Sequence, residues 1–362
     1  MLVFPAVFLD WDKTVMVREK RTVSPWPDAA HWHRLDPQLG RDMENWFNDR
    51  FGGRDFFLAG QARLDWALNG LVRNDDVFSG REGWFFYNKG ESVRSFQNAD
   101  LFSKYERQII RKNIVTRADW LKSLGSSYFL LVAPAKNRVY GEFYPPGIHA
   151  AGSEGRVEQM VHNLQANTSV PVVYVQDELM AAKKEGTFLY FQQDTHWTHE
   201  GAFLGYQALM KRIRQEHPEA QALDASDFRW KTEVERGGDL TALTRLKSLP
   251  SVSPAHYTVL DLAQPFPYQF VQTRPGEEYH TVCPGKPFKV WMFSDSFGGF
   301  LLPFLSSTFG EVVYVWSPLF NEYQKDMVAF QPDLVIHEIA ERLVPALLVN
   351  QPPLKPVEAH AF

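Results

Sequence analysis

The stretch Lys289-Val-Trp-Met-Phe-Ser-Asp-Ser-Phe-Gly-Gly299 decides the fold. Its first five residues form an apolar run that is typical of a buried strand, and residues from about Phe297 to Phe309 favour a helix. The polar residues Ser294-Asp-Ser296 join the two, so they follow the carboxyl end of the strand. Because ligands bind at this end of the strands in open parallel sheets, we expect a functional loop here.

The same alternation of strand and helix extends in both directions. Apolar strands linked by helices indicate an α/β protein with a mostly parallel sheet that is covered on both faces. The expected strands are Tyr128–Val132, Pro171–Val175, Thr187–Phe191, Lys289–Phe293, Val312–Trp316 and Leu334–His337. The expected helices lie near Leu101–Leu124, Gly155–Thr168, Asp177–Lys184, His199–His217, Phe297–Phe309 and Asn321–Phe330. Residues from about 218 to 287 break this rhythm and are interpreted as a β-rich insertion.

The N-terminal part of the chain differs in character from the rest. Residues 1–60 are polar, aromatic and interrupted by prolines, and we interpret them as an arm that leads into a main domain at 61–350. Residues 1–9 are apolar but too short to span a bilayer. Two interpretations stay open for them: a buried first strand or frayed end, and the end of a truncated membrane anchor or signal segment.

Composition excludes several classes of function. The chain has 362 residues, a net charge of −5 and no basic run, which argues against a nucleic-acid ligand. The single cysteine, Cys283, excludes an intramolecular disulfide framework and a multi-cysteine zinc module. No glycine-rich phosphate-binding motif is present, so no nucleotide is indicated, and we expect no cofactor. Aromatic residues make up 14% of the chain, a weak hint of sugar binding.

Two loops carry residues suited to acyl transfer. A serine in Ser294-Asp-Ser296 would be presented on a sharp turn, with the amides of the following helix free to hold an oxyanion. The alternative is that these residues simply cap the helix. In the other loop, Asp194 would orient His196 if the backbone stays extended, because residues two apart then project to the same side. A packed histidine beside a turn aspartate is the alternative.

A metal site competes with the acyl-transfer interpretation. Asp194, His196 and His199 are plausible ligands, and His149 or Glu200 offers a fourth. Thr198, however, is a good N-cap residue, which would place His199 in the first turn of a helix and direct its side chain away. We therefore expect no metal.

Several other polar residues follow expected strands. Lys136, Arg138 and Tyr140 come after the strand Tyr128–Val132, where they either bind substrate or form a solvated turn. Glu338 and Glu341-Arg342 follow the last strand, and a surface ion pair explains them as well as a substrate contact does.

These motifs together resemble the alginate O-acetyltransferase family of the AlgJ and AlgX type, whose catalytic domain is similar to SGNH hydrolases. Asp194-Thr-His-Trp197 matches the family's Asp-x-His-Trp motif, and Asp295-Ser-Phe297 matches the end of its Gly-Asp-Ser-Phe motif. Further matches follow the same order along most of the chain: Asn48-Asp-Arg-Phe-Gly-Gly-Arg54, Gly80-Arg-Glu-Gly-Trp-Phe-Phe-Tyr87, Pro134-Ala-Lys-Asn-Arg-Val-Tyr140, Pro332-Asp-Leu-Val335 and Glu341-Arg342.

The resemblance implies both a fold and a catalytic triad. The fold is a three-layer SGNH hydrolase-like domain with permuted motif order, since the Asp-His pair precedes the serine. Ser296 is implied as nucleophile, His196 as general base and acid, and Asp194 as the residue that orients it. Lys136, Arg138, Tyr140 and Trp197 are expected to bind substrate. Ser294 stands where the family usually has glycine, which questions the turn geometry and leaves Ser294 as a rival nucleophile.

The resemblance also implies a reaction and a location. Its members move acetyl groups to hydroxyls of an exported polysaccharide in the periplasm, so we expect transfer through an acetyl-serine. A membrane-bound O-acyltransferase would supply the acetyl donor, and an N-terminal segment would hold the protein at the inner membrane. Two alternatives stay open: a carbohydrate esterase with the same triad, and a non-catalytic polysaccharide-binding assembly protein.

Overall fold

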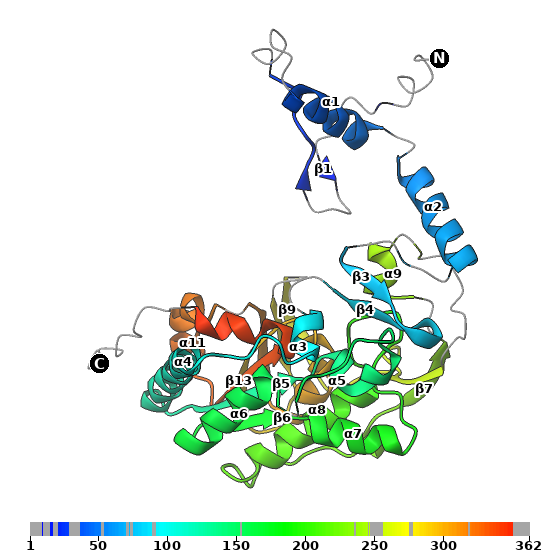
Figure 1. Cartoon of the computed structure of the whole chain (residues 1–362). Coiled ribbons are helices and arrows are strands. Elements are labelled where there is room, and N and C mark those ends of the chain that lie inside the picture. Colours follow the sequence, from blue (N-terminus) through cyan, green and yellow to red (C-terminus); the bar gives the residue numbers. More distant parts are fainter. Residues whose placement is uncertain are drawn as a thin grey trace.

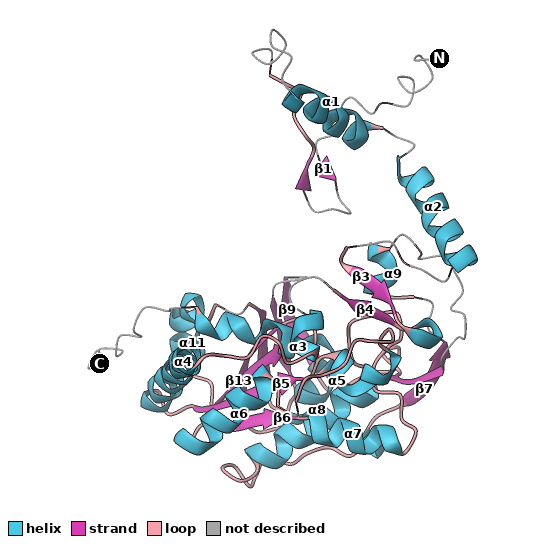
Figure 2. Ribbon diagram, in the orientation of Figure 1, coloured by secondary structure: helices cyan, strands magenta, loops and turns pink. Residues whose placement is uncertain are grey.

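The computed structural model of the chain has a central sheet with helices on both faces, from which the N-terminal elements extend (Figure 1; Figure 2). No described helix is both long enough and apolar enough to cross a membrane. Residues 1–8 of the apolar N-terminal segment lie outside the described residues. The structure describes residues 9, 15–16, 21–28, 37–51, 54–69, 72, 75–88, 92–152, 154–234, 237–244, 246, 256–274, 278–317 and 319–349.

In the described part of the chain, the central sheet has seven strands in the order β6-β5-β13-β11-β12-β10-β9. The first five run parallel to one another, and β10 and β9 are antiparallel at one edge. This arrangement confirms the predicted α/β class and the mostly parallel sheet. The strands are β5 (Ser127–Ala133), β6 (Val172–Tyr174), β9 (Gln269–Arg274), β10 (Glu278–Val282), β11 (Lys289–Ser294), β12 (Glu311–Trp316) and β13 (Leu334–Ala340).

Alternate residues of each strand enter different cores, which produces the three layers. Phe129 and Leu131 of β5 pack with one set of helices, whereas Leu130 and Val132 pack with the other. The first core is covered by α5 (Lys136–Tyr140), α7 (Gln176–Lys184), α8 (His199–Ile213) and α10 (Leu302–Thr308). The second is covered by α4 (Lys104–Ser123), α6 (Arg156–Asn167) and α11 (Gln324–Phe330).

The remaining elements are short or lie outside the three layers. The small strands are β1 (Val15–Met16), β2 (Arg21–Thr22), β3 (Val77–Ser79), β4 (Phe85–Tyr87), β7 (Trp230–Val234) and β8 (His256–Leu260). The other α-helices are α1 (Pro37–Arg50), α2 (Arg54–Asn69), α3 (Ser92–Phe96) and α9 (Asp239–Leu243). The 3-10 helices are η3 (Arg81–Gly83), η4 (Gly141–Phe143), η5 (Ala225–Asp227), η6 (Gly298–Phe300), η7 (Phe320–Tyr323) and η8 (Glu341–Leu348).

The predicted insertion at 218–287 is only partly outside the sheet. Its last two strands, β9 and β10, pair with each other, and β10 joins the sheet through β12. They lie at an edge and are polar, so their sequence lacks the apolar run of a central strand. The first part of the segment forms the β7–β8 pair and the short helix α9, which packs against β4.

The predicted strand Thr187–Phe191 is wrong. These residues do not enter the sheet, and only Tyr190 forms an isolated bridge, with Trp197. Leu189 and Tyr190 are fully buried in the first core, so their apolar character reflects burial of a loop. The amide of Leu189 donates to the hydroxyl of Tyr140 over 3.0 Å, which gives this loop a fixed path without a strand partner.

The last turn of α2 meets the domain through Trp66, whose ring packs edge-on against Phe85 of β4 at 5.3 Å. Earlier in the chain, α1 and the β1–β2 pair lie away from the central sheet (Figure 1). The predicted boundary at residue 60 falls inside α2. The division into an arm and a main domain stays a prediction.

Candidate active site

Two loops meet at the carboxyl end of the sheet. The indole Nε1 of Trp197 donates to the carbonyl of Phe297 over 3.0 Å, and the ring of His196 packs against the ring of Phe297 at 5.1 Å. The loop that carries Asp194 and His196 is therefore joined to the turn that carries Ser296. Residues 100 positions apart in sequence come together here. Both loops were expected at the carboxyl ends of strands, but only the serine turn follows a strand of the sheet.

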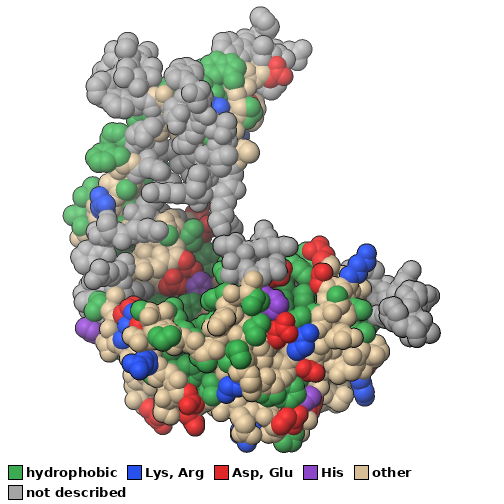
Figure 3. All heavy atoms as spheres, turned by 180° about the vertical axis from the view of Figure 1, so that it is seen from behind, with side chains coloured by type: hydrophobic (Ala, Val, Ile, Leu, Met, Phe, Trp, Pro, Cys, Tyr) green, Lys and Arg blue, Asp and Glu red, His purple; other side chains and the backbone are tan. Residues whose placement is uncertain are grey.

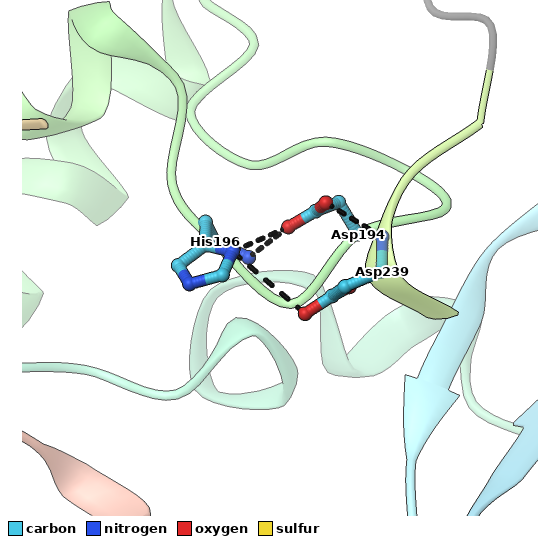
Figure 4. Close-up of side chains that lie close together, drawn as sticks. All are labelled: Asp194, His196 and Asp239. Carbon is cyan, nitrogen blue, oxygen red and sulfur yellow. Dashed lines mark hydrogen bonds and ion pairs between the residues drawn. The ribbon is translucent and has the colours of Figure 1, made fainter. Parts of the chain in front are cut away.

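Asp194 and His196 form a tight pair (Figure 4). Oδ1 of Asp194 lies 2.6 Å from Nδ1 of His196 and also accepts the His196 backbone amide over 2.9 Å. The pairing was predicted, but from an extended backbone, and that reason is wrong. The loop is a turn in which the aspartate side chain bonds the amide two residues on, which is a habitual conformation of aspartate.

The pair keeps Asp194 charged. Burial by itself would raise the pKa of this carboxyl, but hydrogen bonds from His196 and from the Asp239 amide, with the charge of His196, lower the pKa to about 2. A carboxylate at Nδ1 fixes the proton there and leaves Nε2 as the basic nitrogen. Nε2 of His196 is shielded from solvent and has no hydrogen-bond partner among the described residues.

Asp239, at the start of α9, is a third member of the site that the sequence did not assign. Its amide donates to Oδ2 of Asp194 over 2.8 Å, and its own carboxylate accepts the amide of Thr195 over 2.8 Å. One Asp239 oxygen lies 3.8 Å from Nδ1 of His196 (Figure 4). The preceding Gly238 touches Asp194, where an added Cβ would lie 2.3 Å from the carboxylate. The only sequence signal for this contact was Gly238-Asp-Leu240, a short motif without a visible partner.

Asp194, His196 and Asp239 are also close enough to one another to hold a metal ion. Their donor atoms are already used, because the Asp194 oxygens bond His196 and the Asp239 amide, and the Asp239 oxygens bond Thr195. This is the pattern of a hydrogen-bonded network. His199 does not join the group, because Thr198 caps α8 through the Gly201 amide and leaves His199 in the first helical turn.

The turn Ser294-Asp-Ser296 is held by the side chain of Asp295. Its Oδ1 accepts the Phe297 amide over 2.9 Å, and its Oδ2 accepts the Ala340 amide from the end of β13 over 2.7 Å. The Asp295 amide in turn donates to the buried carboxyl of Glu338 over 3.2 Å. These bonds fix the backbone on both sides of Ser296, which is half-buried.

Ser294 differs from Ser296 in accessibility. It is the last residue of β11, is buried and has no positive φ, so serine fits this position without backbone strain. The β-carbon of Ser294 lies close to Gly298, where an added Cβ would meet it at 2.4 Å. Ser294 therefore packs under the turn, and Ser296 is the more accessible serine.

Amides at the start of the helix after Ser296 were expected to hold an oxyanion, and two of them bond within the turn instead. The helix was predicted to begin directly after Ser296, but a 3-10 turn, η6, comes first and α10 begins only at Leu302. The amides of Phe297 and Gly298 bond Asp295 within the turn. The amide of Ser296 has no hydrogen-bond partner among the described residues. This amide is therefore available to an oxyanion.

Ser296 and His196 are not hydrogen-bonded to each other among the described residues. The two loops are nevertheless in contact, because Phe297, the residue after Ser296, packs against His196 and accepts a hydrogen bond from Trp197. Catalytic hydrogen bonds are often long or poorly aligned before substrate binds. A buried nitrogen without a hydrogen-bond partner costs free energy, so a side-chain movement that brings a hydroxyl to Nε2 of His196 would be favourable.

Three residues expected to bind substrate have protein partners instead of an open surface. Nζ of Lys136 donates to the carbonyls of Phe191, Gln192 and Asp194, and therefore ties the loop of Asp194 and His196 to α5. Arg138 forms a buried ion pair with Glu341 at 2.8 Å. Tyr140 is buried and bonds the loop at Leu189. Direct contact of these side chains with substrate stays a prediction, as it does for the fully buried Trp197.

Glu338 and Arg342 also lie beside the serine turn. Glu338 is fully buried, and burial together with the nearby charge of Asp295 raises its pKa well above the ordinary value. Arg342 stacks its guanidinium over the ring of Phe297 at 5.3 Å and lines a small hollow of about 40 Å³ with Thr195 and Lys136. The two residues of the motif Glu341-Arg342 therefore differ in role: Glu341 pairs with Arg138 inside the protein, whereas Arg342 lies beside the serine turn.

Comparison with known proteins agrees with this architecture. Residues 77–322 match the family described as the SGNH hydrolase-like domain of the acetyltransferase AlgX. The chain belongs to this family. The match confirms the resemblance inferred from the motifs and the predicted SGNH hydrolase-like fold.

Curated relatives include two proteins described as probable alginate O-acetylase AlgJ. The one from Pseudomonas fluorescens is 30% identical over 56% of this chain, and the one from Pseudomonas syringae pv. tomato is 29% identical over 68% of it. The matched region spans 51% and 61% of those two proteins, respectively. Among solved structures, Bacillus cereus PatB1 with a sulfonyl adduct superposes with a TM-score of 0.54 at 13% identity, covering 74% of this chain and 97% of that one. That likeness concerns the fold.

Proposed function

We propose that this protein is an O-acetyltransferase that moves acetyl groups to hydroxyls of a polysaccharide through an acetyl-serine on Ser296. The observation that carries the proposal is the 2.6 Å bond between Asp194 and Nδ1 of His196, which leaves Nε2 unpartnered beside the serine turn. Membership of the AlgX family and the probable alginate O-acetylases among the relatives support acetyl transfer to a polysaccharide.

The first half-reaction forms the acetyl-enzyme. Oγ of Ser296 attacks the carbonyl carbon of the acetyl donor while Nε2 of His196 takes the hydroxyl proton. Asp194 stabilises the imidazolium, and the Ser296 amide donates to the oxyanion. The tetrahedral intermediate then collapses, the bond to the donor oxygen breaks, and His196 returns its proton to that leaving oxygen.

The second half-reaction repeats these steps in reverse order with a new acceptor. A sugar hydroxyl gives its proton to Nε2 of His196 and attacks the acetyl-serine carbonyl. The second tetrahedral intermediate collapses to the sugar ester, and His196 returns the proton to Oγ of Ser296. The enzyme is regenerated and the acetyl group has moved without net hydrolysis.

The location and donor belong to the same proposal. The AlgJ and AlgX resemblance supports a periplasmic protein that receives acetyl groups beside a membrane-bound O-acyltransferase and that is attached to the inner membrane. Fractionation of cells that express the full gene tests this. Recovery in the periplasmic or inner-membrane fraction is expected, and recovery in the cytosol alone would contradict it.

The chemistry is tested by intact-protein mass spectrometry after exposure to an activated acetyl ester. A gain of one acetyl group is expected for the wild type and for Ser294→Ala, and none for Ser296→Ala. With an oligosaccharide acceptor present, loss of the acetyl group must produce acetylated sugar faster than free acetate. Discharge to water alone would favour an esterase, and no adduct with any donor would favour a binding protein.

A further inference from the structure

A groove of about 680 Å³ opens beside the Asp194–His196 pair, between α8 and the β7–β8 pair. It is lined by the loop residues Phe191 and Asp194, by His199 of α8, and by Lys231 and Glu233 of β7. Figure 3 shows a hollow on one face of the molecule in which acidic and histidine side chains lie among apolar ones. The volume suits several sugar rings better than an acetyl group.

The wall of this groove is continuous with the catalytic histidine. The ring of Phe300 stacks on His196 at 5.7 Å and also contacts His199 at 5.1 Å and Phe191 at 6.2 Å. Phe191 in turn packs against Tyr257 of β8 at 5.0 Å. Phe300 therefore connects His196 to two aromatic residues of the groove wall, of which Phe191 is half-buried and Tyr257 is almost fully buried. The aromatic face of Phe191 is suited to the apolar face of a sugar ring.

The charge of the groove is acidic. Lys231 is the one cationic side chain among its described lining residues, against the carboxylates of Asp194 and Glu233. Lys231 is already bound, at 2.7 Å from Glu233 and 3.6 Å from Asp261. Burial lowers the pKa of His199 to about 4, so this histidine adds no charge at neutral pH. Carboxylates accept hydrogen bonds from sugar hydroxyls but repel the carboxylates of a uronic acid chain.

We propose that this groove binds the sugar residues next to the acetylated one, and that it selects a neutral, hydroxyl-rich polysaccharide over a polyuronate. This inference rests on the proposed acetyl transfer to a polysaccharide. It departs from the probable alginate O-acetylases among the relatives, because alginate is a polyuronate. Phe191 packs against a sugar ring, and the acidic lining sets the specificity.

The test compares β-1,4-mannohexaose with β-1,4-hexamannuronate, which share a backbone and differ by the carboxylate at C6. Cellohexaose and chitohexaose extend the neutral set. Dissociation constants are measured by calorimetry on the full chain carrying Ser296→Ala, so that no transfer occurs. At least one neutral hexasaccharide is expected to bind about tenfold more tightly than hexamannuronate. Equal or tighter binding of hexamannuronate, or no binding of any hexasaccharide, overturns the proposal.

Two groove variants and one matched control localise the effect. Glu233→Lys is expected to tighten hexamannuronate binding about tenfold, whereas Glu185→Lys, the same charge change on the exposed end of α7, is expected to leave it unchanged. Phe191→Ala is expected to raise the KM for the neutral acceptor about tenfold with little change in kcat. If neither groove variant changes binding, the groove is not the acceptor site.

The donor half-reaction separates the two proposals. Glu185→Lys, which lies outside the groove, should accept an acetyl group on Ser296 from an activated ester at the wild-type rate. Failure of the wild type to form an acetyl-serine would overturn the proposed function. Normal acetyl-serine formation without preference among acceptors would overturn only the inference about the groove.

Discussion

The backbone amide of Asp239 donates a hydrogen bond to Oδ2 of Asp194 over 2.8 Å, which ties the segment after β7 to the loop of Asp194 and His196. Asp194 therefore has one oxygen on His196 and the other on α9. Orientation of the histidine depends on a segment 45 residues further along the chain. Gly237 of the same segment lines the groove beside this pair. If the groove binds the acceptor as proposed, acceptor binding and histidine orientation share one structural element.

Gly238→Ala tests this connection. The added Cβ would lie 2.3 Å from the Asp194 carboxylate, so either α9 or the carboxylate must move. Because a displacement of about 1 Å in a catalytic group can cost about 100-fold in rate, we expect kcat to fall by 10- to 100-fold. The measurement is the rate of acetyl-serine formation with an activated ester. Gly60→Ala is the control, since a Cβ there meets nothing within 4 Å, and its rate should match the wild type.

The pKa of Asp194 leads to a prediction about acid stability. A free aspartate titrates near pH 3.9, whereas the pKa of Asp194 is about 2 in the folded protein. A carboxyl whose pKa is lower in the folded state stabilises the fold at pH values above its pKa in the unfolded chain. This stabilisation is lost as the pH falls through its pKa in the folded protein. We expect about 2 kcal/mol of difference between wild type and Asp194→Asn at pH 6, and most of it gone at pH 2. Urea unfolding at both pH values measures this; a difference that is the same at both would contradict it.

For Glu338 we expect the opposite dependence of stability on pH. Its pKa is raised well above the usual value by burial and by the charge of Asp295, so the folded protein favours the protonated form. Such a group lowers the stability of the fold as the pH rises from about 4.3, the pKa of a glutamate in the unfolded chain, towards its pKa in the folded protein. Glu338→Gln keeps an acceptor for the Asp295 amide and removes this cost. We therefore expect the variant to gain stability relative to wild type between pH 5 and pH 8, as measured by urea unfolding.

Glu341→Gln is the matched control for that experiment. Glu341 is equally buried, but it forms an ion pair with Arg138 at 2.8 Å. Removal of its charge leaves a buried guanidinium without its counter-ion, so this variant should be destabilised by about 3 kcal/mol or more throughout pH 5 to pH 8. If Glu338→Gln behaves like Glu341→Gln, the protonated state assigned to Glu338 is wrong.

Much of the fold could be predicted from the sequence because the central strands are buried on both faces. The apolar runs at β5, β11 and β13 indicate strands on their own, and Thr198 marks the helix start at α8. The edge strands β9 and β10 are polar and have no such apolar run, so they were not predicted as strands of the central sheet. The apolar run at Leu189 and Tyr190 was wrongly predicted to be a strand, since burial alone does not distinguish a strand from a packed loop.

The site shows the same division between local and distant contacts. Asp194 and His196 are two residues apart, so their pairing could be predicted even though the reason given, an extended backbone, was wrong. Asp239 could not, because its contact with Asp194 spans the β7 region and leaves no periodic pattern. Lys136 was expected to face substrate because of its loop position, but its three carbonyl partners lie in another loop.

Lys136→Met separates positioning from substrate contact. The ammonium of Lys136 donates to three carbonyls of the loop that carries Asp194 and His196, and methionine fills the space without donating to them. Three buried carbonyls without a donor predict a loss of about 2–4 kcal/mol in the free energy of unfolding and a fall in kcat. KM for the acceptor should change little. Lys184→Met, at the exposed end of α7, is the control and should behave as wild type. A raised KM with unchanged stability and kcat would instead show that Lys136 binds the acceptor directly.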